Sequence, residues 1–563
     1  MNRAELLETL RTRGLSYDPE VKLLRMPLTA TYHTALKPDR HPEVYHLLGS
    51  SNYAFDLLET GEQADLERAS LILHTVVLQQ DRDPARDTYG IWPYFYEEPL
   101  DEMDRPDWNM ADFHGKRLIL VLRKHGDRLS AGLVRQIREA IAHACRAIIK
   151  RNMGPHYTNI AIMGAFVTLV GGELLGEGLF RDYGLSRLKR FYDFTFGIGT
   201  FSEYNSPDYT PIAIRELHSI HEETSLPEAK ALASQLLDLA WRMAGEHYHA
   251  GTGEWSGPHS RTYRTMLSPN QHGFLAEAML DETFEFGENV RCPAEYRGLF
   301  TSNKPRSFAE PTLAEEQAGY QVYATLYQDE RLSLGSFDKG VMWNQRRNLI
   351  AYVQTPGGAV YMQLQFLMNG RDFCSAMYAG AQYRTEALFG FNLLTDNGAW
   401  HSDLDKIDGR FRADDLRIRL RIGGAVGELP DPVCLDGKRA ELQLGGVRLA
   451  VQPVLEEADY AELCLEASRD AEGVYLDYVV YSGEEISFDF HTVSRAVWLF
   501  ALAINEDGRL PEVAVAGNSG RVQAAAVYGA ETISVSLSAA PGPTLERFRS
   551  NSVQLPSSAG ARV

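Results

Sequence analysis

The chain up to about residue 310 repeats the apolar spacing that a helix with one buried face requires. The clearest segment follows Ser130, a residue type that favours the start of a helix. Its apolar positions lie three or four residues apart, at Leu133, Ile137, Ile141, Ala144 and Ile148. Similar patterns predict helices at 41–59, 63–81, 109–124, 156–176, 179–196, 207–222 and 269–281. Roughly ten helices in succession are therefore expected.

From about Tyr320 the pattern changes to short apolar and aromatic runs of period two. Val474–Tyr481 and Thr532–Leu537 are examples, and Gly, Asp and Asn turns separate such runs. The change falls in 301–311, a polar stretch with prolines that is typical of a domain boundary. Helices followed by strands indicate two separate architectures instead of an alternating α/β fold. We expect a helical domain at 1–312 and an antiparallel β-sandwich at 313–563.

Composition and charge exclude several classes of protein. The chain is 44% hydrophobic and 23% charged, as in ordinary globular proteins. The formal net charge of −20, with no basic patch, predicts neither nucleic acid nor membrane as a partner. The N-terminal segment has the pattern of an amphipathic helix and lacks a signal-peptide cleavage site. This pattern predicts a cytoplasmic protein. Five scattered cysteines and the absence of nucleotide-binding motifs predict no metal and no cofactor.

Four short polar and aromatic clusters lie where predicted helices begin. They are the segments 107–114, 154–159, 199–209 and 255–263. If the helices alternate in direction, a ring of helix pairs would place all four clusters around one concave opening. Free N–H groups and positive dipole ends at helix starts favour an anionic ligand. The sequence therefore predicts a site for acidic molecules.

The predicted helix starts indicate where two residues of these clusters lie. Pro155 and Pro207 suit a first helical turn, and Ser206 is a good N-cap. Asn159 and Tyr209 then fall in or just after a first turn, so both side chains would face the opening. The alternative is that these residues only end loops and make local hydrogen bonds.

The segments Gly199–Glu203 and Ser206–Tyr209 resemble the stretch that carries the catalytic tyrosine in heparinase II/III-like and alginate-type polysaccharide lyases. The Asn159 segment, fifty residues earlier, resembles the asparagine segment of those enzymes. The resemblance implies an incomplete (α/α)6-type toroid, which carries the catalytic site, followed by an antiparallel β-sandwich. One position departs from the pattern. Ile160 stands where many of those lyases have a histidine, so either His156 or His259 takes the role of that histidine or the chemistry differs.

The resemblance implies an enzyme that cleaves poly- or oligosaccharides containing uronic acid by β-elimination. Such an enzyme removes the proton beside the carboxylate and expels the 4-linked sugar, which leaves a C4–C5 double bond. Hydrogen-bond donors must neutralise the carboxylate as charge builds up on it, and Asn159, His156 and Arg261 are suitable donors.

A base and an acid must also move protons during elimination. Tyr209 is the candidate by resemblance, and His259 with Tyr263 is the second pair by residue type. Glu203 completes the predicted catalytic set.

Four further residues are predicted to bind substrate, namely Asn205, His114, Trp343 and Arg346. In the β half, Trp343 and Arg346 combine an aromatic platform with a cation, which suits sugar stacking and carboxylate binding. His114 has an alternative interpretation, because it could simply join neighbouring helices.

Two other functions stay open at this point. A glycoside hydrolase of the glucuronidase type would use paired carboxylates on the same toroid. Its candidates are Glu203, Asp208, Asp107, Asp112 and Glu254. A glycan-binding protein without catalysis is the second alternative. The expected partner in each case is an acidic oligosaccharide, and whether the chain forms a homo-oligomer is left open.

Overall fold

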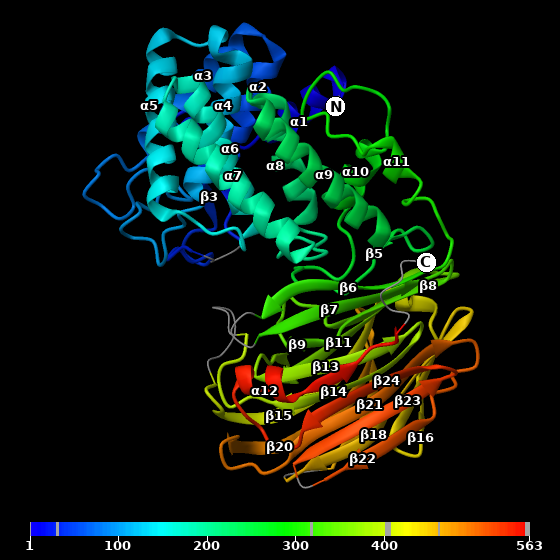
Figure 1. Cartoon of the computed structure of the whole chain (residues 1–563). Coiled ribbons are helices and arrows are strands. Elements are labelled where there is room, and N and C mark those ends of the chain that lie inside the picture. The colour runs from blue at the N-terminus through cyan, green and yellow to red at the C-terminus, as the bar shows by residue number, and fades with distance from the viewer. Residues whose placement is uncertain are drawn as a thin grey trace. The chain divides into compact units, whose positions relative to one another are not determined.

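A computed structural model describes residues 2–29, 33–315, 319–399, 407–459, 462–518 and 520–557 of the chain. Helices occupy most of the N-terminal part, and antiparallel sheets occupy the C-terminal part (Figure 1). The predicted fold class, a helical region followed by an antiparallel β domain, is confirmed.

The helices follow one another with few interruptions. They are α1 (Arg3–Gly14), α2 (Leu47–Thr60), α3 (Gln63–Leu78), α4 (Met110–His125), α5 (Ala131–Arg151), α6 (Thr158–Leu175), α7 (Gly178–Ile198), α8 (Thr210–Glu223), α9 (Pro227–His247), α10 (Pro269–Ala278) and α11 (Ala294–Arg297). Short strands lie between them, namely β1 (Tyr17–Asp18), β2 (Leu23–Pro27), β3 (Glu43–Tyr45), β4 (Tyr248–His249) and β5 (Glu254–Trp255).

The predicted helices lie within three residues of the observed bounds at both ends, except for the first. The prediction of a helix at 41–59 is wrong at its start. Glu43–Tyr45 forms β3, which pairs with β2. His46 then caps α2, because its Nδ1 accepts a hydrogen bond from the backbone N of Gly49 at 2.8 Å.

The helical core contains the apolar faces that the spacing predicts. The five apolar positions of α5 are all buried, and Ser130 Oγ accepts from the backbone N of Leu133 at 3.3 Å as the predicted cap. Helix α6 packs against α4 and α5 and is buried on every side from Thr158 to Gly172. By length and composition α6 could span a membrane, but 83% of it is buried inside the protein, as expected of a central core helix.

Three antiparallel sheets form the C-terminal part. One has the order β19-β20-β15-β11-β10-β8-β7-β6, with β12 beside β11. Its strands are β6 (Arg306–Glu315), β7 (Tyr320–Gln328), β8 (Leu332–Phe337), β10 (Leu349–Thr355), β11 (Gly358–Met368), β12 (Arg371–Asp372), β15 (Arg410–Gly424), β19 (Cys464–Arg469) and β20 (Val474–Asp489).

The second sheet has the order β16-β17-β18-β21-β14-β13-β9, and the third has the order β22-β23-β24-β25. Their strands are β9 (Lys339–Val341), β13 (Ala376–Tyr383), β14 (Glu386–Leu393), β16 (Val433–Leu435), β17 (Arg439–Leu444), β18 (Val447–Ala458), β21 (Ala496–Asn505), β22 (Val513–Gly517), β23 (Arg521–Tyr528), β24 (Glu531–Ser538) and β25 (Ser552–Gln554). The short helix α12 (Thr544–Ser550) precedes β25.

The second sheet lies between the other two, so both of its faces are buried. Trp498 and Phe500 of β21 pack into the core shared with the first sheet, together with Phe389 of β14. Val497 and Leu499 pack into a separate core shared with the third sheet. Because side chains alternate along a strand, a strand buried on both faces reads as a continuous apolar run. The β part is therefore a sandwich with a third layer.

The chain divides into two compact units, which differ from the predicted segments 1–312 and 313–563. The helical unit contains 1–197, 212–240 and 277–291. The β unit contains 292–563 together with the segments 198–211 and 241–276. The segment 241–276 contacts the β unit through its backbone, as described below for His259 and Arg347.

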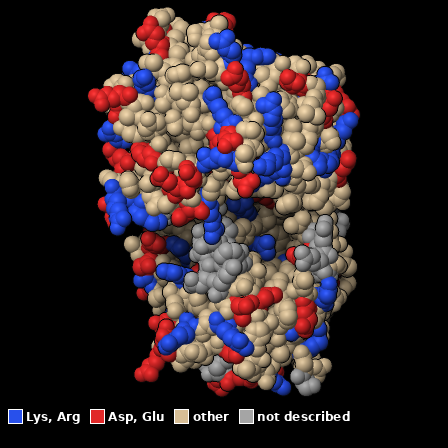
Figure 2. Space-filling view, turned by 90° about the vertical axis from the view of Figure 1, so that its left-hand side faces the viewer, with Lys and Arg blue, Asp and Glu red and all other residues tan. Residues whose placement is uncertain are grey.

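Charged residues of both signs are interspersed over the face of the molecule shown in Figure 2. This mixed pattern accompanies the net charge of −20. On this face, acidic and basic side chains alternate at short range.

Phe389→Ala should lower the free energy of unfolding by roughly 3–5 kcal/mol, because the substitution leaves a cavity in the core between two sheets. Urea denaturation followed by tryptophan fluorescence measures the change. Val527→Ala on β23 is the control, since Val527 is 69% exposed and its truncation should cost less than about 0.5 kcal/mol. Equal losses for the two variants would contradict the described core.

Candidate functional site

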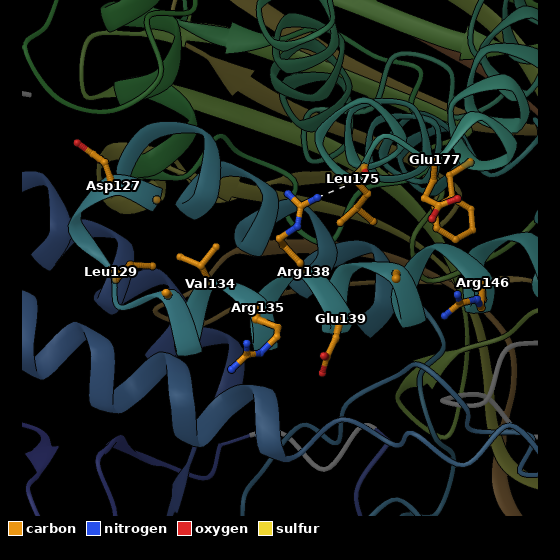
Figure 3. Close-up of a pocket in the computed structure, with 13 residues that line it drawn as sticks. Asp127, Leu129, Val134, Arg135, Arg138, Glu139, Arg146, Leu175 and Glu177 are labelled. Carbon is orange, nitrogen blue, oxygen red and sulfur yellow. Dashed lines mark hydrogen bonds between the residues drawn. The ribbon is translucent and has the colours of Figure 1, made fainter.

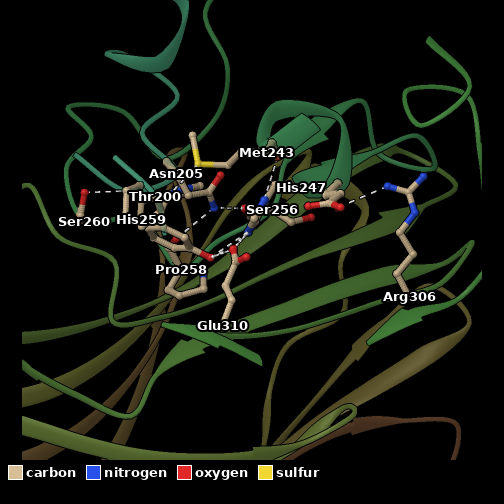
Figure 4. A network of polar contacts seen from close by, with 12 residues as sticks. Thr200, Asn205, Met243, His247, Ser256, Pro258, His259, Ser260, Arg306 and Glu310 are labelled. Atoms are coloured by element: carbon tan, nitrogen blue, oxygen red, sulfur yellow. Dashed lines mark hydrogen bonds and ion pairs between the residues drawn. The ribbon is translucent and has the colours of Figure 1, made fainter. Parts of the chain in front are cut away.

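The side-chain amide of Asn205 joins the two loops that carry most of the predicted site. Asn205 is fully buried, and its backbone has a left-handed φ of +48°. Its Nδ2 donates to the carbonyl oxygens of Ser256 at 2.7 Å and Pro258 at 3.0 Å (Figure 4). Its Oδ1 accepts from Trp255 Nε1 at 2.6 Å. Asn205, which we predicted to bind substrate, holds segment 198–211 against segment 255–259 in the structure.

His259 is also fully buried. Its Nδ1 lies 2.7 Å from the backbone oxygen of Asn205, which can only accept, so Nδ1 carries the proton. Burial lowers the pKa of His259 to about 3, and the ring is neutral at physiological pH. Its Nε2 has no hydrogen-bond partner among the described residues. His259, which we predicted to be catalytic, is therefore enclosed in the structure, and its catalytic role stays a prediction.

Backbone contacts attach segment 255–263 to the β sheets. His259 and Arg347 exchange two backbone hydrogen bonds, of 3.2 and 3.0 Å, as an isolated β-bridge. The backbone N of Thr262 donates to the carbonyl oxygen of Gln345 at 2.6 Å. A Cβ at Gly335 would lie 1.9 Å from the carbonyl oxygen of Gly257, so a side chain on β8 would push this segment away.

Tyr209 and Tyr263 form a pair at the surface of these loops. Their phenolic oxygens are 2.7 Å apart, which is a hydrogen bond in which either oxygen can donate. Tyr209 is 9% exposed, whereas Tyr263 is 58% exposed. The backbone N of Tyr209 donates to Ser206 Oγ at 3.1 Å, so the predicted cap exists. Because α8 begins at Thr210, Tyr209 lies one residue before the helix and not inside its first turn.

Arg261 binds both tyrosines. Its guanidinium carbon lies 4.4 Å from the ring centre of Tyr209, and its Nη2 donates to the Tyr263 oxygen at 3.1 Å. Glu203 Oε1 accepts from Nη1 at 3.1 Å, and Gln345 Oε1 accepts from Nε at 2.9 Å. Burial alone would lower the pKa of Arg261, but the nearby Tyr209, Tyr263 and Glu203 oxygens raise it.

Asp208 fixes the loop that carries Tyr263. Its Oδ2 accepts from the backbone N of Tyr263 at 2.7 Å and from Thr262 Oγ1 at 3.0 Å. Its Oδ1 accepts from Gln271 Nε2 at 3.0 Å. The carboxylate is thus occupied by three donors, which leaves it in a structural role beside the tyrosine pair.

The protonation of Tyr209 follows from its environment. Burial raises the pKa of Tyr209 far above its usual value, the Arg261 guanidinium lowers it, and the Tyr263 hydroxyl raises it further. A phenol in this environment keeps its proton at neutral pH and acts as a donor. The pair and the cation together can bind an anionic group and supply one proton.

The other two predicted clusters meet in the helical unit. Asn109 joins them, because its Nδ2 donates to Tyr157 Oη at 3.5 Å and its Oδ1 accepts from Arg151 Nη1 at 2.6 Å. Asn159 is 6% exposed, and its Oδ1 accepts from the backbone N of Ile160 at 2.9 Å. His156 is exposed. The four clusters therefore come together as two pairs, one pair in each compact unit.

Arg187 and Asp112 support the helix start that carries Asn159. Arg187 donates from Nε to the carbonyl oxygen of Ala161 at 3.1 Å and from Nη2 to that of Ile160 at 3.2 Å. A Cβ at position 164, now glycine, would lie 2.9 Å from Asp112 Oδ1 and 3.0 Å from Arg187 Nε. Gly164 therefore leaves the space in which these two charged groups approach each other.

Asp112 is almost fully enclosed, at 2% exposure. Burial raises its pKa to about 7, although Arg187 and Arg151 lower it. Its Oδ1 has no hydrogen-bond partner among the described residues. The carboxyl group thus titrates near neutral pH.

The remaining predicted residues are His114, Trp343 and Arg346, and the contacts described for them involve other residues than the tyrosine pair. His114 is fully buried, stacks on Trp92 at 4.8 Å, and burial lowers its pKa to about 3. It joins helices, which was its alternative interpretation. Trp343 and Arg346 lie in the turn between β9 and β10, where the Arg346 N donates to the Trp343 carbonyl oxygen at 2.9 Å. Burial lowers the pKa of Arg346.

Sequence reasoning missed several residues that build these sites. Gln345 was not predicted, although it orients Arg261, and Arg187 was not predicted either. Tyr204 was also missed. Its hydroxyl donates to Glu310 Oε1 at 2.7 Å and lies 2.9 Å from His247 Nε2; these two partners are labelled in Figure 4. Gln345 is adjacent to the predicted Arg346, which was the one available signal.

Two open cavities lie in the helical unit. One is a groove of about 760 Å³ along α5, lined by Arg135, Arg138 and Arg146 (Figure 3). Arg138 donates to the carbonyl oxygens of Leu174 and Leu175 at the end of α6. The other, of about 560 Å³, lies among α2, α4 and α8.

Comparison with known proteins gives a partial match. Residues 28–280 match a family model described as a domain of unknown function, DUF8769, and this segment is less than half of the chain. No curated protein matches the chain. A crystal structure of heparinase III is similar over 91% of this chain and 84% of its own, with 11% sequence identity and a TM-score of 0.44. That degree of similarity is too low to assign a site or an activity.

The raised pKa of Asp112 predicts that the stability of the protein depends on pH, and Asp112→Asn should abolish this dependence. The carboxyl pKa is about 7 in the folded chain and 3.8 as the reference value, so folding favours the protonated form. Its stabilising contribution is complete below pH 3.8 and is lost as the pH rises through 7. As the pH rises, the unfolding free energy of the wild type should therefore fall by up to about 4 kcal/mol more than that of Asp112→Asn.

Urea denaturation of both proteins between pH 4.5 and 8 measures this difference. Asp182→Asn is the control, because Asp182 is exposed and its substitution should leave the pH dependence unchanged. Parallel curves for the wild type and Asp112→Asn would rule out the raised pKa.

Proposed function

We propose that the protein cleaves uronic-acid-containing oligosaccharides by β-elimination at the site formed by Tyr209, Tyr263 and Arg261. The observation that carries the proposal is the 2.7 Å contact between two phenolic oxygens beside a half-buried guanidinium. The short sequence resemblance to polysaccharide lyases at Gly199–Tyr209 supports the same reaction class. The substrate would be an acidic oligosaccharide, and a cytoplasmic location stays a prediction.

Arg261 would bind the uronate carboxylate. A guanidinium has five N–H donors, and three are used by Glu203, Gln345 and Tyr263. The remaining two can donate to a carboxylate, whose negative charge increases as the neighbouring proton leaves. Asn159 and His156, the other two predicted donors, belong to the helical unit, and their role stays a prediction.

The two tyrosines would divide the proton transfers. Hydrogen-bond donors from Arg261 and Tyr209 converge on the Tyr263 oxygen, so negative charge on that oxygen is stabilised. The Tyr263 phenolate takes the C5 proton, the C4–O bond breaks, and a C4–C5 double bond forms. Tyr209 gives its proton to the departing oxygen and recovers one from Tyr263 across the 2.7 Å hydrogen bond.

The hydrolase alternative requires two available carboxyl groups. Glu203 is ion-paired with Arg261, and Asp208 accepts three hydrogen bonds. Burial raises the pKa of Glu254 to about 7, which suits an acid, but the group is only 3% exposed and bonds the backbone N of Leu267. These contacts favour elimination over hydrolysis.

Tyr209→Phe and Tyr263→Phe should each lower kcat by about 10²-fold or more, because each removes a group that moves a proton. The substrates are oligosaccharides of 1,4-linked glucuronate, mannuronate and iduronate, and ultraviolet absorbance of the unsaturated product follows the reaction. Tyr96→Phe is the matched control, since Tyr96 is exposed and lies in the helical unit. Its kcat should equal that of the wild type.

Mass analysis of the products separates the two reactions. Elimination leaves one product that is lighter by one water molecule, whereas hydrolysis adds water to the cleaved bond. Products that contain added water, together with an inactive Glu203→Gln variant and an active Tyr209→Phe variant, would refute elimination.

Arg261→Lys should lower kcat/KM by roughly 10- to 100-fold, mainly through a higher KM, because an ammonium group cannot contact Glu203, Gln345 and Tyr263 together. Arg264→Lys is the control, since Arg264 is exposed three residues further along the same loop. Steady-state kinetics on the same oligosaccharides measure both. An unchanged KM for Arg261→Lys would contradict carboxylate binding at this residue.

A further inference from the structure

The cavity of about 560 Å³ in the helical unit has chemistry that the proposed lyase site does not use. It is lined by α2, α4, α8 and the segment 287–289. Its volume lies in the range of small-molecule sites. Charged groups line it on several sides, including Lys116, Arg117, Glu216 and Glu288.

An ion-pair network closes one side of this cavity. Lys116 Nζ lies 2.7 Å from Glu216 Oε1 and 3.4 Å from Glu288 Oε1. Burial would lower the pKa of Lys116, but the two carboxylates raise it above its usual value. Glu216 is 6% exposed, and its Oε2 is buried without a hydrogen-bond partner among the described residues. The cavity thus presents an unused acceptor.

Arg117 provides unused donors in the same cavity. Its guanidinium carbon lies 4.7 Å from the ring centre of Phe55. The described residues give it no hydrogen bond and no ion pair within 4 Å. Burial lowers the pKa of Arg117, whereas the charges of Asp56, Glu288 and Glu216 raise it. Arg117 is only partly buried, so these N–H groups stay accessible to a ligand. A guanidinium edge matches the two oxygens of a carboxylate.

The acidic lining limits the charge that such a ligand can carry. Asp56, Glu216 and Glu288 all line the cavity, and each repels an anion. A monovalent carboxylate is tolerated better than a phosphate, which carries close to two charges at neutral pH. A hydroxyl group on the ligand would donate to Glu216 Oε2.

We propose that this cavity is a second binding site, which takes a small hydroxylated carboxylate of the sugar-acid class, with its carboxylate on Arg117 and a hydroxyl on Glu216. The site lies wholly in the helical unit, whereas Arg261 and the tyrosine pair belong to the β unit. It is independent of the proposed activity.

Isothermal titration of the full chain with sodium D-glucuronate tests the site. Wild type should bind glucuronate, and Arg117→Met, which keeps the aliphatic stem, should bind it at least tenfold more weakly. Arg135→Met is the matched control, because Arg135 lines the other groove of the same unit. Its affinity should equal that of the wild type. Arg261→Lys should retain the Arg117-dependent binding, which separates this site from the proposed lyase site.

Two further ligands sharpen the test. D-Glucose lacks the carboxylate and inorganic phosphate carries more charge, so both should bind more weakly than glucuronate. Thermal unfolding of Arg117→Met and of the milder Arg117→Lys shows that both variants are folded. The proposal is overturned if Arg117→Met and Arg117→Lys both bind like the wild type, if phosphate binds more tightly than glucuronate, or if glucuronate does not bind the wild type.

Discussion

The buried amide of Asn205 is the interaction on which the candidate lyase site depends. It uses both N–H groups and its oxygen to hold two loops whose own backbones have no regular partner strand along most of their length. A buried amide with all these bonds made is costly to disturb, because each lost bond leaves a polar group without solvent. The positions of Tyr209 on one loop and Tyr263 on the other follow from this connection.

The polar side chains around the tyrosine pair are of two kinds. Some fix the positions of the loops and of Arg261, and others are exposed to solvent. Asp208, Gln345 and Glu203 are saturated by loop atoms or by Arg261, so they define geometry. Tyr263 is the exposed member of the group. The arrangement resembles other sites in which a rigid polar shell orients a small number of reactive atoms.

Periodicity was sufficient to predict the helices and the change to strands, because burial of one helix face leaves a direct trace in residue spacing. The helix start at Ser130 and the cap at Ser206 were predicted for the same local reason. The third sheet was not predicted, since a strand buried on both faces looks the same whichever sheets cover it.

Burial of polar residues is the feature of the candidate site that the sequence did not reveal. Asn205 and His259 lie in segments rich in Gly, Pro and Ser, which suggest exposed loops, and His114 lies on a predicted helix, yet all three are fully enclosed. Their enclosure depends on partners that are distant in sequence, such as Trp92 for His114 and Arg347 beside His259. Local composition carries no information about such partners. Tyr209, Tyr263 and Arg261 were grouped correctly because they lie in two clusters that are both next to helix starts.

The alternation of segments between the two compact units has a practical consequence. The chain passes from one unit to the other at 197/198, 211/212, 240/241, 276/277 and 291/292. A truncation near residue 312, where the sequence pattern changes from helical to strand-like, would therefore separate 198–211 and 241–276 from the rest of the β unit. Expression of either half alone would yield incomplete cores with exposed strand edges, which favour aggregation. Fragment studies of this protein need circularly permuted or internally linked designs instead of a single cut.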